Sequence, residues 1–290
     1  MQAAAFCPAH VTGFFKAFPG DDPDRAGSTG AGFSLSVGVT TRVRVSAGSG
    51  HVITASGHDP GGTAVSEHVL RQFEGIAGPR RTEVCHEVGV PAGYGLGASA
   101  AAALSLSLAL DAALGTGLGR EGAARVAHRA EIACRTGLGD VIAALHGGLE
   151  VRTRPGAPGI GEVVSRRSGD IAVISCIAPV RTSSFMRDGM DRINGRGGRM
   201  VSEMLESPDT ARFQEMSLEF ARHAGVVTPR MEEAAARIRG AGAPCGVALF
   251  GETVFSLVEP GGERRVLDAL EGAAGTTITS GIGGGARMVG

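Results

Sequence analysis

The sequence predicts an α+β protein built as two units, and three stretches support this prediction. From Phe33 to Val45, apolar residues recur at nearly every second position, as in a half-buried strand. The long apolar stretch Ala98–Leu114 predicts a buried helix. Pro and Gly cluster between Arg152 and Gly161, as they do where a chain passes from one unit to the next. We therefore expect one domain over residues 1–155 and a second over residues 156–290.

The first unit is expected to begin with extended segments. The apolar stretch Ala3–Phe15 is interrupted by Pro8 and Gly13, and it predicts a short strand, a turn and a second extended piece. Residues 19–32 are rich in turn formers, which is typical of a disordered surface loop or of a substrate loop. A helix, a strand and a second helix are predicted further along, at Thr63–Ala77, Glu83–Val90 and Glu121–Arg135.

The second unit is expected to mix strands with amphipathic helices. Strands are predicted near Val163 and over residues 171–178, and Cys245–Val258 predicts two strands joined by a turn. Thr228 and Pro229 are typical of a helix start, with Thr as the N-cap and Pro at the first helical position. Residues 281–285 predict a turn between terminal strands. Three more helices are predicted at Arg181–Glu206, Thr210–His223 and Glu263–Gly272.

Composition limits the class of protein. The 290 residues are enough to bury a substantial core. The net charge of −1 indicates neither a nucleic acid nor a membrane as partner. Five widely spaced cysteines, none with zinc-ligand spacing, predict reduced thiols in a cytoplasmic protein, and the N-terminus has no signal-peptide pattern. Symmetric homodimers are the commonest soluble oligomers, so we expect a homodimer.

The stretch Pro91–Leu110 carries the strongest functional signal. Gly93, Gly95 and Gly97 alternate with bulkier residues, and the predicted helix follows directly. Glycine lets the backbone approach a ligand closely and adopt positive φ. The first N–H groups of a helix lack intrahelical partners, and together with the helix dipole they favour an anion. This stretch therefore predicts a phosphate-binding loop.

Other interpretations of this stretch remain open. It carries no charge and is long enough to span a membrane, but its proline, glycines and serines argue against a lipid environment. A buried helix entered by a turn has the same pattern. Gly93, Gly95 and Ala98 fit a dinucleotide-binding motif, yet Pro91 intervenes and no second strand with an acidic end follows. A Walker loop is excluded because it needs Gly-Lys-Ser/Thr, and Lys16 is the only lysine.

A second chemical landmark is the segment Thr136-Gly137-Leu138-Gly139-Asp140. Aspartate is a favoured N-cap, so Asp140 could simply cap a short helix that continues to Leu145. The same carboxylate could instead act on a ligand held by the glycine loop. The residues of this segment alone do not decide between the two roles.

These segments resemble the GHMP small-molecule kinases, such as galactokinase, homoserine kinase and mevalonate kinase. The glycine loop is similar to the family pattern Pro-x-x-x-Gly-Leu-Gly-Ser-Ser-Ala-Ala, although the first serine is replaced by Ala98. Glu131 and the Gly139-Asp140 turn follow in the family's order. The resemblance implies that ATP binds the loop through Pro91, Gly93, Tyr94, Gly95, Leu96, Gly97, Ala98 and Ser99.

The first family motif has a counterpart near the N-terminus, in residues 7–15. The family pattern has Pro-Gly followed by Arg or Lys, whereas Ala9 and His10 occupy those places here. The form Pro-Ala-His-x-Thr-Gly-Phe-Phe resembles one branch of the family, the archaeal pantoate kinases. The segment Gly27–Gly32, followed by a strand with Thr40 and Thr41, is similar to the same branch.

The resemblance implies a two-domain GHMP kinase fold, with an N-terminal ribosomal-protein-S5-like α/β domain and a C-terminal ferredoxin-like α+β domain. It also implies a kinase that uses ATP and Mg²⁺ to phosphorylate the 4-hydroxyl of (R)-pantoate for coenzyme A synthesis. Asp140 would be the base, and Ser99 and Glu131 would hold Mg²⁺. The expected substrate contacts are His10, Thr12, Arg25 and Ser28.

Three alternatives stay open. Another GHMP kinase could act on a different small acceptor, such as mevalonate or homoserine. A non-catalytic ATP-binding sensor would explain the missing first-motif cation, Ala98 and the degenerate third motif at residues 246–257. The retained Ser99 and Asp140 argue against a sensor. An oxidoreductase with a nicotinamide cofactor is the remaining alternative.

Overall fold

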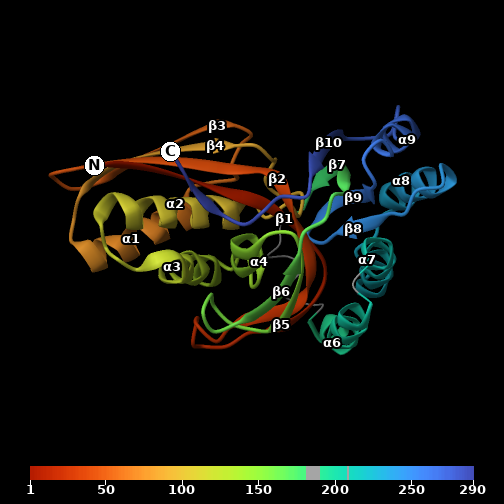
Figure 1. The fold of residues 1–290 in the computed structure, drawn as a ribbon, viewed down its shortest axis with the longest axis horizontal. Coiled ribbons are helices and arrows are strands. Elements are labelled where there is room, and N and C mark those ends of the chain that lie inside the picture. The colour runs from red at the N-terminus through yellow and green to blue at the C-terminus, as the bar shows by residue number, and fades with distance from the viewer. Residues whose placement is uncertain (181–189, 208) are drawn as a thin grey trace.

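The computed structural model describes residues 1–180, 190–207 and 209–290, and its elements form two sheets flanked by helices (Figure 1). The described residues contain eight helices and eleven strands, so the predicted α+β class is confirmed.

The first sheet is organised around two long antiparallel strands, β1 (Gln2–Phe18) and β2 (Gly27–Ser46). Its order is β11-β1-β2-β4-β3, and β5 pairs with β2 and with β6. β5 pairs with the first half of β2, whereas β4 pairs with the second half. The remaining strands of this sheet are β3 (His51–Gly57), β4 (Arg81–Val88), β5 (Leu149–Arg154), β6 (Glu162–Arg166) and β11 (Arg287–Val289).

The prediction of a turn within residues 3–15 is wrong, because β1 is one continuous strand. Its register against β2 shifts between Pro8 and His10 and again between Thr12 and Phe14. Such irregularities bend a strand and redirect its side chains, which absorbs Pro8 and Gly13 without a chain reversal. β2 likewise begins at Gly27, so the second half of the predicted loop 19–32 is strand.

Four helices cover one face of this sheet: α1 (Ala64–Ala77), α2 (Ala98–Leu114), α3 (Gly119–Cys134) and α4 (Asp140–His146) (Figure 1). α2 is the central one and contacts β1, β2 and the other three helices. It is buried along most of its length, which explains its largely apolar sequence. Within the described ranges, no helix combines the length and apolar character required to cross a membrane.

The second sheet has the order β10-β7-β9-β8. The Thr228 hydroxyl accepts a hydrogen bond from Met231 N at 3.3 Å, so the predicted cap is present. The first part of the predicted helix 181–206 lies outside the described residues. The strands are β7 (Ile171–Pro179), β8 (Gly246–Ala248), β9 (Gly251–Val258) and β10 (Thr276–Gly281), and the helices are α6 (Met190–Glu206), α7 (Thr210–Ala224), α8 (Pro229–Gly240) and α9 (Glu263–Ala269).

The two sheets share a core. α6 and α7 contact β1, and the Phe33 ring of β2 lies 5.0 Å from the Phe255 ring of β9. β11 returns to pair with β1, so the chain ends near its beginning (Figure 1). Residues 155–161 connect β5 with β6, both in the first sheet, and the first strand of the second sheet along the chain is β7. The division at residue 155 stays a prediction.

Candidate active site

The glycine loop connects β4 to α2 and has the backbone that a close ligand contact requires. Gly93, Gly95 and Gly97 have φ angles of 83°, 70° and 63°. His10 N donates a hydrogen bond to Leu96 O at 3.0 Å, which fixes the loop to β1. The N-cap residue of α2 is Gly97, which has no side chain to cap the helix. Its first amide groups are therefore free to bind an anion.

The turn between β8 and β9 lies against this loop. A Cβ atom at Gly95 would lie 2.1 Å from the carbonyl oxygen of Leu249, and one at Gly251 would lie 2.3 Å from Tyr94 C. Leu249 N also donates to Thr12 O at 3.3 Å. The segment expected to stand for the third family motif thus contacts the glycine loop directly.

Gly95→Ala is expected to lower the free energy of unfolding by about 2–3 kcal/mol, because alanine meets both the left-handed backbone and the Leu249 carbonyl. Gly115→Ala is the matched control: Gly115 has a φ of 64°, but a Cβ there meets nothing within 4 Å. That variant should lose about 1 kcal/mol. Urea denaturation of both proteins measures the difference, and equal losses would contradict a steric role for Leu249.

Charged side chains form a row next to the loop, in which Asp140 is 26% exposed and the other three are at most 1% exposed. His10 donates from Nδ1 to Asp140 at 2.9 Å and from Nε2 to Glu150 at 3.0 Å. Arg152 donates from Nη1 to the same oxygen of Glu150. Thr12 donates to the Asp140 carboxylate at 3.3 Å. Since ionised carboxylates only accept hydrogen bonds, both ring nitrogens of His10 must carry protons. The four charged side chains therefore alternate in sign along the row, from Asp140 through His10 and Glu150 to Arg152, and their net charge is zero.

The pKa directions agree with this geometry. Burial alone would lower the pKa of His10, but the hydrogen bonds and charges of Asp140 and Glu150 raise it above its ordinary value. Burial alone would raise the pKa of Asp140, whereas the hydrogen bond and charge of His10 lower it, with help from Arg152. Asp140 is therefore ionised at neutral pH, beside an imidazolium.

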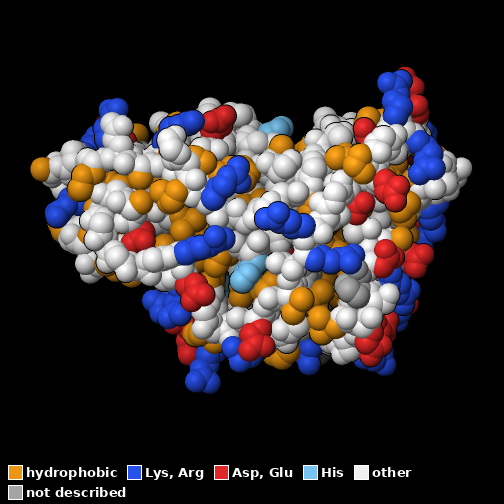
Figure 2. Space-filling model, viewed as in Figure 1, with side chains coloured by type: hydrophobic (Ala, Val, Ile, Leu, Met, Phe, Trp, Pro, Cys, Tyr) orange, Lys and Arg blue, Asp and Glu red, His pale blue; other side chains and the backbone are white. Residues whose placement is uncertain are grey.

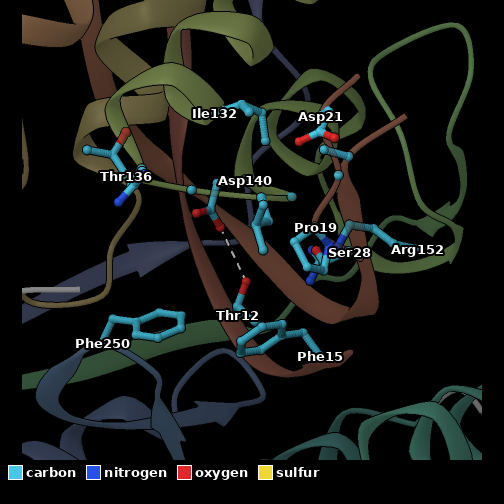
Figure 3. Close-up of a pocket in the computed structure, with 16 residues that line it drawn as sticks. Thr12, Phe15, Pro19, Asp21, Ser28, Ile132, Thr136, Asp140, Arg152 and Phe250 are labelled. Atoms are coloured by element: carbon cyan, nitrogen blue, oxygen red, sulfur yellow. Dashed lines mark hydrogen bonds between the residues drawn. The ribbon is translucent and has the colours of Figure 1, made fainter. Parts of the chain in front are cut away.

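A cavity of about 680 Å³ opens onto this row (Figure 3). Asp140 and Thr12 lie on one side, and Ser28 and Arg152 lie together on the other. A Cβ at Gly139 would lie 2.2 Å from Ser28 Oγ and 2.9 Å from Arg152 Nε, so only glycine fits between them. The cavity walls also include Phe15 of β1, Ile132 of α3 and Phe250 of the β8–β9 turn, with Pro19 and Asp21 at the rim.

The structure brings three of the four expected substrate residues to this site. Thr12 and Ser28 line the cavity, and His10 lies directly behind Asp140. Arg25 is outside the lining: its side chain is 84% exposed and pairs with Asp22. Among the described residues, two cations line the cavity: Arg135, which is exposed, and Arg152, which is 1% exposed and lies beside Ser28.

Ser99 and Glu131 also come together, although they lie far apart in the chain. Ser99 Oγ donates to Glu131 at 3.3 Å, and Thr136 Oγ1 donates to its other oxygen at 2.7 Å. A Cβ at Gly137 would lie 2.6 Å from the Glu131 carboxylate, so glycine keeps room for it. No group of three or more His, Cys, Asp or Glu within residues 1–180, 190–207 and 209–290 could hold a metal.

A smaller hollow of about 190 Å³ adjoins this pair. Ser99 and Thr136 line it, and Thr136 also lines the large cavity. The start of α1 and the β3–α1 loop provide most of its other walls. The two hollows therefore meet at Thr136, and Ser99, which follows the glycine loop in sequence, lines the smaller one.

Comparison with known proteins identifies the family. The model of the GHMP kinases N terminal domain matches residues 64–148. Pantoate kinase of Thermococcus kodakarensis is 33% identical over 267 residues, which cover 89% of this chain and 88% of that protein. The chain belongs to the pantoate kinase branch of the GHMP kinases. The family resemblance recognised in the sequence is thereby confirmed.

Solved structures confirm the GHMP kinase fold. A structure described as a phosphotransferase related to the CoA biosynthesis pathway is 27% identical, with a TM-score of 0.89 over 100% of this chain and 99% of that chain. MDDEF in complex with MVAPP, AMPPCP and magnesium is 17% identical, with a TM-score of 0.76 and the same coverage. The second match shows the fold alone.

In this GHMP kinase the positive charge of the first motif is carried by a histidine, His10. The family pattern has Arg or Lys at the place of His10, and the neutral side chain of histidine looked like a lost cation in the sequence. Because His10 lies between Asp140 and Glu150, it is held protonated. A positive charge therefore still lies beside Asp140.

Sequence patterns did not single out Glu150 or Arg152. Both side chains lie on one face of β5, opposite Leu149 and Val151, which belong to the hydrophobic core. The available signal was two opposite charges at alternate positions in a strand next to Gly147-Gly148. Such pairs usually lie on a solvated face, so only their burial distinguishes them.

Glu131→Gln is expected to change how stability depends on pH in the absence of metal and nucleotide. Burial raises the pKa of Glu131 to about 7, and the charge of Asp140 adds to the effect. The wild type should therefore be most stable relative to the variant below the ordinary carboxyl pKa, and should lose up to about 3 kcal/mol of this advantage as pH rises through 7. Denaturation at pH 5 and pH 8 measures the change; parallel curves would contradict it.

Proposed function

We propose that this protein transfers the γ-phosphoryl group of ATP to the 4-hydroxyl of (R)-pantoate, giving (R)-4-phosphopantoate for coenzyme A synthesis. The observation that carries the proposal is that Asp140 and Arg152 line one cavity. One can take a proton from a hydroxyl and the other can bind a carboxylate, and pantoate has both groups. The relation to a pantoate kinase supports this assignment. The reaction would draw on the cytoplasmic pool of ATP.

The triphosphate of ATP would lie along the glycine loop, with its oxygens on the amide groups of residues 93–99 and the start of α2. The nucleoside would extend into the smaller hollow beyond Ser99. MDDEF, which has the same fold, forms a complex with AMPPCP and magnesium. This arrangement directs the γ-phosphate toward Thr136, where the two hollows meet.

Ser99 and Glu131 would hold Mg²⁺, for which oxygen ligands are preferred. Two protein oxygens fit a cation that takes its remaining ligands from phosphate and water. Mg²⁺ in this place would neutralise charge on the phosphates during transfer. A bound cation would also stabilise the ionised form of Glu131, whose pKa is otherwise raised by burial.

Asp140 would orient the 4-hydroxyl of pantoate and accept its proton as the new P–O bond forms. The Nδ1–H group of His10 holds the Asp140 carboxylate in place, and Thr12 donates to the same oxygen. Glu150 in turn fixes the His10 ring through Nε2. Because phosphoryl transfer has a loose transition state, this positioning matters more than the strength of the base.

Arg152 would bind the pantoate carboxylate, a role for which the structure favours it over Arg25. Arg152 lines the cavity, and its Nε atom is buried without a hydrogen-bond partner among the described residues. A buried donor left unpaired is costly, and a carboxylate would satisfy it. Ser28 lies next to the guanidinium and could donate to the same group.

Arg152→Gln is expected to raise the KM for pantoate at least about tenfold and to leave the KM for ATP nearly unchanged. Arg25→Ala is the matched control, because it removes an exposed arginine near the same cavity. Steady-state kinetics with each substrate varied measure both constants, and thermal unfolding checks that the variants fold. A larger pantoate effect at Arg25 would reverse the assignment.

The activity itself is tested by ADP release with Mg-ATP and one acceptor at a time: pantoate, pantothenate, mevalonate or homoserine. Turnover on pantoate alone is the expected result. Turnover on another acceptor would retain the phosphotransferase chemistry and overturn the substrate. If ATP binds and no acceptor turns over, the protein is a nucleotide sensor instead of a kinase.

A further inference from the structure

A separate hollow of about 590 Å³ lies where three connecting segments meet. They are the α4–β5 turn, the end of β6 with the segment after it, and the β10–β11 loop. We call it the basic hollow, and the residues used below are His146, Ser165, Arg166, Arg167, Ser168 and Gly284. Two sequence features without a role in the active site, His146 and the glycine run 281–285, thus come together here.

The charges that line the basic hollow have a single sign. It contains two arginines, a histidine and two serines, and none of the described side chains that line it is a carboxylate. Neither Arg166 nor Arg167 forms an ion pair with a described carboxylate, whereas Arg154 on the same hairpin pairs with Glu162. Figure 2 shows basic side chains gathered around a histidine in the middle of the face where Figure 1 places α4 and β6.

One glycine of the hollow has no structural reason to be glycine. A Cβ at Gly283 would lie 2.1 Å from Leu35 O, and one at Gly285 would lie 2.1 Å from Leu145 O, so packing requires both glycines. A Cβ at Gly284 would meet nothing within 4 Å, and its φ is not in the left-handed region. The absence of a side chain at Gly284 leaves the hollow open.

We propose that the basic hollow binds the phosphate group of a small ligand. The planar guanidinium groups of Arg166 and Arg167 match phosphate oxygens in a bidentate manner. Ser165 adds a hydroxyl group that can donate to the same oxygens, whereas the Ser168 hydroxyl donates to the Asp170 carboxylate at 2.7 Å. The volume exceeds that of a phosphate ion, so the hollow also accommodates a phosphomonoester.

The position of the hollow relative to the active site gives such a ligand a structural connection to it. Gly148 N donates to Gly283 O at 2.8 Å, which joins the β10–β11 loop to the α4–β5 turn. This turn lies between Asp140, at the start of α4, and Glu150, in β5. A phosphate-bearing ligand would therefore contact the segment that carries both carboxylates around His10.

Titration calorimetry with pyrophosphate at constant ionic strength tests the proposal. The double variant Arg166→Ser/Arg167→Ser should bind at least tenfold more weakly than the wild type. The matched control is Arg264→Ser/Arg265→Ser, which removes two adjacent exposed arginines from α9 and should stay within twofold. All these proteins keep the glycine loop intact, so pyrophosphate bound there contributes equally. Equal affinities in the two double variants would overturn the site.

Gly284→Glu is a second, independent variant, because it adds a carboxylate to the lining of the hollow at a position where a Cβ meets nothing within 4 Å. Its affinity for pyrophosphate should also fall at least tenfold, and unchanged affinity would overturn the proposal. Glycerol 3-phosphate and inorganic phosphate then distinguish the source of the phosphate. Tighter binding of the ester indicates an organic ligand, and equal binding indicates the free ion. A signal that chloride reproduces at the same ionic strength would contradict specific binding.

Discussion

Asp140→Asn is expected to lower kcat on pantoate about 10²–10⁴-fold and to leave the KM for ATP nearly unchanged. The amide has the shape of the carboxylate and can still accept a hydrogen bond from His10, but it cannot take the proton of the substrate hydroxyl. The glycine loop is untouched, so nucleotide binding should persist. Coupled ADP-release kinetics give both constants, and nucleotide titration confirms that the variant still binds ATP.

Asp21→Asn is the matched control for this prediction. Asp21 lines the same cavity, but the described carboxylates that accept hydrogen bonds from the His10 ring are those of Asp140 and Glu150. Its substitution should change kcat less than about fivefold. A greater loss at Asp21 than at Asp140 would assign the base to Asp21. If Asp140→Asn kept wild-type kcat, proton acceptance at this position would be unnecessary for the reaction.

His10→Gln is expected to lower the free energy of unfolding by about 3–5 kcal/mol, because it removes the buried cation between Asp140 and Glu150. Removal of one partner leaves a buried charge without compensation, which costs more than the net contribution of the pair. Urea denaturation at pH 6 measures the loss.

The sign of the pH dependence follows from the raised pKa of His10. The stabilisation by the imidazolium is complete below the ordinary histidine pKa and is lost as pH rises through the raised value in the folded protein. The difference between wild type and His10→Gln should therefore shrink at high pH. A constant difference across this range would mean that the ring contributes through packing alone.

His86→Gln is the matched control for His10→Gln. His86 is also buried, but its ring nitrogens bond to the hydroxyls of Thr41 at 2.7 Å and Ser66 at 3.0 Å. Burial lowers the pKa of His86 to about 4, so this ring is neutral at pH 7. Its substitution leaves no carboxylate unpaired, and the loss should be smaller, about 1–2 kcal/mol. Equal losses at both sites would contradict the charge-based explanation.

The features that sequence reasoning located are those specified over short distances along the chain. The apolar run Ala98–Leu114 forms a helix over those same residues, and the alternating run after Phe33 forms a strand. The glycine loop was recognised because positive φ angles require glycine at fixed positions. Asp140 was recognised from the turn and short helix around it. In each case, residues that are close together in the sequence determine the local backbone conformation.

The features that the sequence did not reveal depend on contacts across the fold. The continuity of β1 comes from pairing with β2, which absorbs Pro8 and Gly13 as register shifts. Arg25 looked like the substrate cation because it lies in a polar loop, yet the buried cation that lines the cavity is Arg152 of β5. A polar residue in a loop is easily noticed, whereas the burial of a charged strand residue depends on elements distant in sequence.

The sequence by itself determined the family, the glycine loop, the likeness to pantoate kinases and the carboxylate expected to act as base, since these are recorded in short contiguous motifs. The tertiary structure decided the electrostatics of the site. His10 is separated by 130 residues from Asp140 and by 140 residues from Glu150. Only the packing of β1, α4 and β5 brings these groups together. Their mutual burial, rather than their identity, makes His10 a cation and places Arg152 at the cavity.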